Sequence, residues 1–342
     1  MLPNEILNQA ESLLQRGDDT QAQNLYEKLI SSPDFAPLAF FRIGEILNRK
    51  GLIDDSISLH QKAFKKCPTL ISKISPTNFK HHEYSYFETE QILSLKCPLC
   101  NEKGRKHSCY NTATYLDFAP GFDPIRIWLI CDQCNHIFAS SRPAQLEEIL
   151  KNTSMGTLEE PDIGACPILG QTIKQLKNGC DARTFFEIGV GMGEMIGVAI
   201  ELGLEVSGIE IRPDYARKIE KLFAVPIHSE NFLNYEPQKR YDIVAMGDVL
   251  EHFIDPLTAL RKASDLLEDR GILWISTPNF ESAFCKLLGD KDPMWKVCEH
   301  LQFFSYQSLK VALDRCNLVA VHYELSSKYR GSMEVMIRKK LA

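Results

Sequence analysis

The segment FFEIGVGMGE, residues 185–194, decides the fold of the C-terminal part of this chain. A short apolar run leads into glycines at every second position, Gly189, Gly191 and Gly193, and the segment closes on Glu194. A strand that ends in glycines and opens a helix is typical of an α/β sheet, because the missing side chains let a ligand reach the main chain. A dinucleotide loop needs a glycine at the sixth position, where this chain has Glu194, so the spacing disfavours NAD and FAD.

Four later segments extend this interpretation, because each is a strand candidate or directly follows one. They are LEVSGIEI (204–211), SENF (229–232), RYDIVAMGDVLEHF (240–253) and GILWISTPN (271–279). Polar residues such as Glu210, Asn231 and Asp248 stand at or just after their carboxyl ends. The carboxyl ends of parallel strands meet at one edge of a sheet, which is where such sheets bind ligands. The sequence therefore predicts a ligand site at this edge.

In this order, EIGVGMGE, SGIEI, YDIVAMGDVLEHF and ISTPN resemble the class I S-adenosylmethionine-dependent methyltransferases. The resemblance implies an α/β fold with a Rossmann-like seven-stranded sheet, whose last two strands, LVAVHYELS and GSMEVMIRKK, form a hairpin. It also implies a set of cofactor-binding residues. They are Glu187, Gly189, Gly191 and Gly193 for the methionine end, Glu210 for the ribose, Asn231 and Phe232 for the adenine, and Asp248 at the end of the fourth strand.

The charge of the glycine segment agrees with this carry-over. FFEIGVGMGEM contains two acids, Glu187 and Glu194, and no Lys or Arg. S-adenosylmethionine carries a sulfonium and an ammonium, so nearby carboxylates offset the cost of removing these charges from water. A pyrophosphate would need basic groups instead.

Methyl transfer to a hydroxyl or a carbon acid also requires the removal of a proton. His252, directly after the fourth strand, is the predicted general base because an ordinary histidine pKa of about 6.5 suits this work near neutral pH. His300 in CEHLQFFS is the second candidate, with packing beside Phe303 and Phe304 as its alternative role. Glu251, next to His252, completes the predicted catalytic set.

The segment TPNFES…EHLQFFSYQSL, with a cysteine-rich segment upstream, resembles bacterial methyltransferases that act on sugars, sugar nucleotides and other small metabolites. We therefore predict transfer of a methyl group to a small hydroxylated metabolite or sugar, on oxygen or carbon. Three alternatives stay open. One is a protein or peptide acceptor, and another is a non-catalytic module that senses the cofactor. The third is metal-assisted 2'-O-methylation of RNA ends, because Asp248, Glu251, His252 and His300 resemble the metal-binding quartet of such enzymes.

Two cysteine pairs predict a metal site upstream of the sheet. KCPLCNE places Cys97 and Cys100 two residues apart, and LICDQCNH does the same with Cys131 and Cys134. Four thiolates on two tight turns complete a closed tetrahedron around zinc, so residues 96–140 are predicted to form a zinc ribbon with a structural Zn²⁺. A redox-active pair is the alternative interpretation. His107, Cys109 and His136 are spare ligands close by.

The first 70 residues repeat themselves with an offset of 34, which is the period of helix-turn-helix repeats. The second copy, AFFRIGEILNRKGLIDDSISLHQKAFKKCP, resembles a tetratricopeptide repeat, although Ser56 and His60 depart from that motif. Each copy is expected to use its glycine, Gly17 or Gly51, to end the first helix. Two copies leave an apolar face to cover, so neighbouring helices, a protein partner or a homodimer are expected there.

The chain of 342 residues is divided by these patterns into five segments. They are helical repeats (1–70), a linker (71–95), the zinc ribbon (96–140), linker helices (141–180) and the methyltransferase domain (181–342). A net charge of −6 disfavours nucleic acid as a partner. Neither a leader peptide nor a long apolar segment is evident, so we expect a soluble cytoplasmic protein without a membrane partner, with its eleven cysteines reduced or metal-bound.

Overall fold

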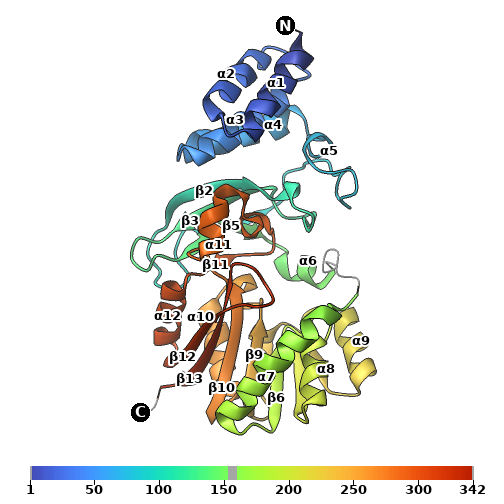
Figure 1. Cartoon of the computed structure of the whole chain (residues 1–342), viewed down its shortest axis with the longest axis vertical. Coiled ribbons are helices and arrows are strands. Elements are labelled where there is room, and N and C mark those ends of the chain that lie inside the picture. The colour runs from blue at the N-terminus through green and yellow to red at the C-terminus, as the bar shows by residue number, and fades with distance from the viewer. Residues whose placement is uncertain (1, 153–159, 341–342) are drawn as a thin grey trace.

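A seven-stranded sheet forms the C-terminal part of the computed structural model, which describes residues 2–152 and 160–340 (Figure 1). Its strands run in the order β12-β13-β10-β9-β6-β7-β8. Their bounds are β6 (Thr184–Ile188), β7 (Glu205–Glu210), β8 (Ile227–Ser229), β9 (Tyr241–Gly247), β10 (Leu267–Pro278), β12 (Leu318–Leu325) and β13 (Ser332–Lys339). Strands β6 to β10 are parallel, and β13 is antiparallel to both β10 and β12. The predicted seven strands and the terminal hairpin are confirmed.

Both faces of this sheet are buried, which explains the nearly continuous apolar runs of its central strands. On one face Phe185 and Ile243 belong to a core shared with α7, α8 and α9, and on the other Phe186 and Val244 pack toward α10 and α12. The helices of this part are α7 (Cys166–Cys180), α8 (Glu194–Glu201), α9 (Pro213–Phe223), α10 (Pro256–Leu266), α11 (Ala283–Leu288) and α12 (Tyr306–Arg315). The short 3₁₀ helices are η1 (Thr112–Thr114), η2 (Ile163–Ala165), η3 (Phe232–Asn234), η4 (Leu250–His252), η5 (Gly289–Lys291) and η6 (Pro293–Lys296).

The cysteine-rich segment forms a second, antiparallel sheet that the C-terminal part completes. Its own strands are β2 (Arg105–Asn111), β3 (Ile125–Ile130) and β4 (Ile137–Ala139). The fourth strand, β11 (Gln302–Phe303), follows His300 in the sequence and pairs with β4. The indole of Trp128 on β3 also donates a hydrogen bond of 3.0 Å to the carbonyl oxygen of Trp295. The sheet is therefore built into the rest of the protein by strand pairing and by a buried aromatic contact.

Helices dominate the N-terminal part, which lies above the second sheet in Figure 1. They are α1 (Pro3–Gln15), α2 (Asp19–Leu29), α3 (Ala36–Arg49), α4 (Ile53–Lys66) and α5 (Ile71–Ile74). Gly17 and Gly51 follow α1 and α3 with φ angles of 81° and 78°, as expected for glycines that end helices. A Cβ on Gly44 would lie 2.9 Å from Nε2 of His60, so the bulky His60 fits only because α3 offers a glycine.

The helices rest partly on the cysteine sheet rather than standing apart from it. The amide of Cys109 on β2 donates to Oδ1 of Asn48 on α3 at 2.8 Å, and Arg49 forms an ion pair of 3.1 Å with Asp290. Phe41 and Phe64 share a core with residues of the cysteine-rich segment. These contacts cover one side of the helical stack, which is part of what two repeats on their own require.

The predicted linker at 71–95 differs from the structure in one respect. Besides the four-residue helix α5, it contains the strand β1 (Gln91–Leu93), which pairs with β5 (Ser141–Pro143). The two helices predicted after residue 140 are present as α6 (Leu146–Asn152) and α7, while residues 153–159 of the loop between them lie outside the described residues. The five-part division of the chain stays a prediction. Among the described residues, every helix is too short or too polar to span a bilayer.

The buried His136 predicts that this protein loses stability in mild acid. Its side chain is inaccessible to solvent, and burial lowers its pKa to about 4. In the unfolded chain the pKa of histidine is about 6.5, so protonation favours unfolding as the pH falls from about 6.5 toward 4. We expect His136→Gln to lose about 2 kcal/mol less stability than wild type between pH 7 and pH 5. Urea unfolding of both proteins at the two pH values measures this difference, and equal losses would contradict it.

Candidate functional site

The glycine segment forms a tight bend between β6 and α8 at the carboxyl edge of the sheet. Gly189, Gly191 and Gly193 have φ angles of 78°, 56° and 87°, which side chains rarely allow. A Cβ on Gly189 would lie 2.5 Å from Cγ2 of Val249, so the bend also needs the space that the glycine leaves. A Cβ on Gly193 would lie 2.7 Å from Cδ1 of Ile219. Gly193 therefore serves the packing of α8 on α9, and it lines neither of the cavities described next.

Two adjoining cavities lie along this bend. The larger has a volume of about 400 Å³, within the range of small-molecule sites. The smaller has a volume of about 120 Å³ and shares Gly189, Gly191, Gly247, Asp248 and Tyr329 with the larger as lining residues. Eight of the predicted site residues line the larger cavity. They are Gly189, Gly191, Glu210, Asn231, Phe232, Asp248, His252 and His300.

The carboxylate of Glu187 points to a cationic ligand in the smaller cavity. Glu187 is only 5% exposed, and its Oε2 has no hydrogen-bond partner among the described residues. Burial and the neighbouring Glu194 raise the pKa of Glu187 well above its ordinary value. A buried acid without a partner is costly to ionise, and a bound ammonium group offsets that cost.

The carboxylate of Glu210 binds the main chain of the bend. Its Oε2 accepts from the amide of Gly191 at 3.0 Å, and its Oε1 accepts from the amide of Arg212 at 2.9 Å. Each oxygen keeps a lone pair for a further donor, as a ribose diol would require. Glu210 therefore joins the glycine bend to the edge of the larger cavity.

Asn231 and Phe232, predicted at an adenine, occupy different positions from each other. The amide group of Asn231 is already engaged: its Oδ1 accepts from the amide of Leu233 at 3.0 Å, and its Nδ2 donates to Oε2 of Glu147 at 2.9 Å. Asn231 caps η3 and holds α6 against the cavity. Phe232 is buried and lines the cavity with its ring, so it alone offers an apolar surface to a base.

Asp248 stands at the junction of the two cavities. It has a φ of 53°, unusual for a residue other than glycine, and its Oδ1 accepts from Oγ of Ser276 at 3.0 Å. Burial raises its pKa to about 6. The left-handed backbone directs the chain from β9 into η4, which carries Glu251 and His252.

The predicted catalytic residues Glu251, His252 and His300 come together at the wall of the larger cavity. The rings of His252 and His300 have centroids 4.9 Å apart, and Nε2 of His300 lies 3.9 Å from Oε1 of Glu251. Burial lowers the pKa of His252 to about 4 and that of His300 well below its ordinary value. Both imidazoles are therefore neutral at neutral pH, whereas the sequence alone indicated an ordinary pKa for His252.

Contacts from the cysteine sheet hold the segment that carries His300. The buried guanidinium of Arg126 on β3 donates to the carbonyl oxygen of Cys298, and Nε2 of Gln302 donates to that of Phe253 at 3.0 Å. The amide of Leu301 donates to the carbonyl oxygen of Glu251 at 2.9 Å. The second sheet thus positions His300 against η4.

Sequence reasoning missed several residues that line the cavities. Arg212 forms ion pairs with Glu210 at 3.7 Å and with Glu299 at 3.4 Å, and it follows the predicted Glu210 by two positions. Glu299 precedes the predicted His300, so both residues were within reach of the strand-end pattern. Glu147, Lys328 and Tyr329 come from α6 and the β12–β13 loop, and no sequence signal marks them.

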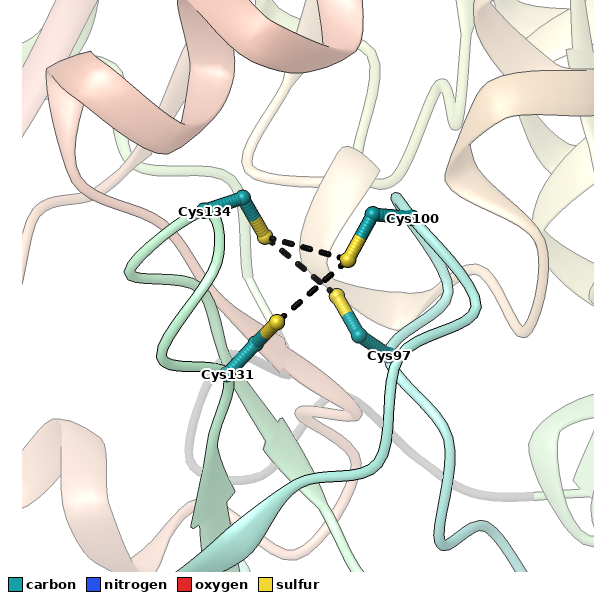
Figure 2. A group of neighbouring side chains, drawn as sticks. All are labelled: Cys97, Cys100, Cys131 and Cys134. Carbon is teal, nitrogen blue, oxygen red and sulfur yellow. Dashed lines mark hydrogen bonds between the residues drawn. The ribbon is translucent and has the colours of Figure 1, made fainter.

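The four predicted metal ligands also converge, as Figure 2 shows for Cys97, Cys100, Cys131 and Cys134. Their sulfurs lie 3.3 to 3.8 Å apart in the contacts Cys100–Cys131, Cys97–Cys134 and Cys100–Cys134. Four thiolates about 2.3 Å from one zinc ion lie about 3.8 Å from each other, so the cluster can hold a tetrahedral ion. The spare ligands are used elsewhere: His136 contacts Gln302 at 2.9 Å, His107 stacks on Trp295, and Cys109 is buried in another core.

Comparison with solved structures gives only weak likenesses. Mitomycin 7-O-methyltransferase MmcR is 18% identical with a TM-score of 0.45, over 56% of this chain and 57% of that chain. The CcbJ methyltransferase from Streptomyces caelestis is 16% identical with a TM-score of 0.43, over 58% of this chain and 97% of that chain. Likenesses at this level carry no argument about the chain.

Two curated relatives match by sequence, and both are named ubiquinone biosynthesis O-methyltransferase. That of Actinobacillus pleuropneumoniae serotype 7 (strain AP76) is 27% identical over 33% of this chain and 53% of the relative. That of Nitrosospira multiformis (strain ATCC 25196 / NCIMB 11849 / C 71) is 31% identical over 28% of this chain and 44% of the relative. The chain spans about half the length of the curated relatives it matches.

A family model described as a methyltransferase domain matches residues 165–323. This range contains the glycine bend, Glu210, Asp248 and the three clustered residues Glu251, His252 and His300. Residues 165–323 of this chain therefore form a methyltransferase domain.

Proposed function

We propose that this protein transfers the methyl group of S-adenosylmethionine to a hydroxyl of a small metabolite or sugar. The observation that carries the proposal is the buried, unpartnered carboxylate of Glu187, placed where two cavities adjoin along the glycine bend. From there the larger cavity extends to the neutral imidazoles of His252 and His300. A cation site and a proton-accepting site thus face one continuous space.

The residues present fit the donor. Glu187 suits the ammonium of its methionine end, the bend at Gly189 and Gly191 leaves the main chain accessible, and Glu210 keeps lone pairs for a ribose. Phe232 offers a ring to the adenine. When bound, S-adenosylmethionine supplies a methyl group activated by its sulfonium. The protein contributes mainly by holding an acceptor atom in line with that group.

His252 is placed to act on the proton of an acceptor hydroxyl. Its Nδ1 lies 3.1 Å from the carbonyl oxygen of Glu299, which can only accept, so Nδ1 carries the hydrogen. Nε2 is left with its lone pair. Because burial keeps this imidazole neutral, it can take a proton at neutral pH without first losing one.

A small hydroxylated acceptor is favoured over the alternatives from the sequence. The curated relatives named above are O-methyltransferases of ubiquinone biosynthesis, and the larger cavity has the size of a small-molecule site. Neither RNA ends, a recruited peptide nor pure cofactor sensing gains support from the comparisons. Whether the acceptor is a sugar is part of this proposal.

We also propose that Cys97, Cys100, Cys131 and Cys134 hold a structural zinc ion. All four ligand positions come from protein thiols, so no open position is left for catalysis. The ion would fix the two turns that precede β2 and β4, and β4 pairs with β11 beside His300. The helices α1 to α4 are proposed to be tetratricopeptide-like repeats. The eleven free cysteines fit a reducing compartment such as the cytoplasm.

Filling the glycine bend should abolish cofactor binding. Gly191 lines both cavities, so Gly191→Asp places a side chain where the donor must lie, and we expect affinity for S-adenosylhomocysteine to fall about tenfold to a hundredfold. Gly203→Asp is the matched control, because Gly203 also has a left-handed φ of 76° but faces open space. Isothermal calorimetry measures both variants, and equal affinities for the two would count against a cofactor site at the bend.

Replacement of His252 should separate binding from turnover. We expect His252→Ala to bind S-adenosylhomocysteine as wild type does but to lower kcat by about 10²–10⁴-fold. Because the pKa of His252 is about 4, wild-type kcat should show no loss from this group near pH 6.5 and should fall only as the pH approaches 4. Steady-state rates across this pH range are the measurement. An acidic limb centred near 6.5 that vanishes in His252→Ala would show that the imidazole titrates normally.

Removal of one cysteine should release the structural zinc. We expect Cys97→Ser to lose one zinc ion per chain and to unfold at a lower urea concentration, because three thiolates no longer close the tetrahedron. Cys67→Ser is the control, since Cys67 lies outside the cluster. Elemental analysis gives the zinc content of both proteins. Undiminished zinc in Cys97→Ser would mean that the cluster is not a zinc site.

A further inference from the structure

We propose that Glu251, His252 and His300 bind a second metal ion, a divalent first-row transition metal, at the wall of the larger cavity. The three residues come from η4 and from the segment that the cysteine sheet holds in place. The role assigned to the ion below rests on the proposed methyl transfer. The site itself rests on the geometry of the three side chains.

The separations of the ligand atoms suit one shared ion. One ligand atom from each residue lies within 4.8 Å of the other two. Nε2 of His300 is 3.9 Å from Oε1 of Glu251, which is too long for a hydrogen bond. Two ligands that are each about 2.1 Å from one ion lie roughly 3 to 4 Å apart, so the same distance is right for a metal between them.

Two buried atoms of this cluster lack partners. Glu251 is 1% exposed and His300 is 6% exposed, yet Oε1 of Glu251 and Nδ1 of His300 make no hydrogen bond among the described residues. The other oxygen of Glu251 accepts from Oγ1 of Thr277 at 2.9 Å, which fixes the direction of the carboxylate. A buried carboxylate oxygen without a partner is destabilising, and a cation at this point removes the cost.

His252 already has the arrangement of a metal ligand. Its Nδ1–H donates to the carbonyl oxygen of Glu299, and this leaves the lone pair of Nε2 for an ion. Histidines that bind metals usually donate their other ring nitrogen to a carbonyl or carboxylate in this way, which fixes the tautomer and the ring orientation.

The donor set determines the class of ion. Two imidazoles and one carboxylate favour Zn²⁺, Fe²⁺, Co²⁺ or Mn²⁺, whereas Mg²⁺ and Ca²⁺ prefer oxygen ligands. Three protein ligands leave positions for water or substrate, as in catalytic metal sites. His252 and His300 line the cavity and Glu251 lies behind its wall, so the open positions face the cavity.

An ion here would act on the acceptor directly. The acceptor hydroxyl would become a further ligand, its pKa would fall, and its proton would pass to solvent. The resulting alkoxide then attacks the methyl group: the carbon–oxygen bond forms, the sulfonium–carbon bond breaks, and S-adenosylhomocysteine leaves with the electron pair on sulfur. In this case the lone pair of His252 is held by the ion and does not itself take the proton.

The test uses the full chain with its cysteines loaded with zinc and Mn²⁺ as the probe. The electron paramagnetic resonance signal of free Mn²⁺ decreases as the ion binds, so a titration gives both stoichiometry and affinity. We expect one Mn²⁺ per chain, displaced by Zn²⁺, and an affinity at least about tenfold weaker in Glu251→Gln and His300→Ala. His322→Ala is the control, because His322 is a half-exposed histidine on β12 that lies 3.6 Å from Glu324, outside the cluster. It should bind Mn²⁺ as wild type does.

The outcomes separate this inference from the proposed function. Absence of Mn²⁺ binding to wild type, or equal binding by wild type and Glu251→Gln, overturns the metal site even if methyl transfer is observed, and His252 then remains the direct base. Absence of S-adenosylhomocysteine binding in calorimetry overturns the proposed function, while the Mn²⁺ titration still decides the metal site. Glu251→Gln keeps the shape of the side chain, so the comparison does not depend on whether His300→Ala folds.

Discussion

Burial of carboxylates at one edge of a parallel sheet is the constraint on which the rest of this structure depends. Glu187, Glu210, Asp248 and Glu251 all lie there with little access to water. Ionised acids in such a place need donors or cations, and each is served differently. Glu210 takes main-chain amides and Asp248 a serine hydroxyl, while one oxygen of Glu187 and one of Glu251 remain unpartnered. The two unsatisfied oxygens mark the two ends of the proposed site.

The second sheet brings the C-terminal segment to this edge. Arg126, Trp128 and β4 all bind main-chain groups between residues 295 and 303, and His300 lies among them. Zinc-linked turns support the same strands, so the proposed structural ion and the proposed catalytic residues belong to one connected body. The prediction of a ribbon that folds separately misses this, because β11 lies far from the cysteines in the sequence and forms only two pairs of residues.

Periodicity and motif order predicted much of the fold but less of the site. The strands of the sheet are long apolar runs, and their carboxyl ends carry Glu210, Asp248 and His252, so one topological rule brings these residues together. Asn231 differs because its short side chain satisfies its own turn and Glu147, and capping of this kind depends on neighbours that the local sequence does not show. Lys328 and Tyr329 reach the cavity from a hairpin loop, where no periodic signal exists. The lowered pKa of His252 was equally beyond the sequence, because it arises from burial.

Neutral imidazoles beside buried acids make chemical sense for a cationic donor. If His252 and His300 were protonated, their charges would repel a sulfonium and an ammonium across a cavity with few water molecules. Burial prevents this, and Arg212 adds a positive charge that is balanced locally by Glu210 and Glu299. The wall near the acceptor therefore presents lone pairs rather than cations, whereas the opposite end presents Glu187. This asymmetry orients the donor with its ammonium away from the histidines, and it leaves the lone pairs of His252 and His300 for a proton or a metal ion.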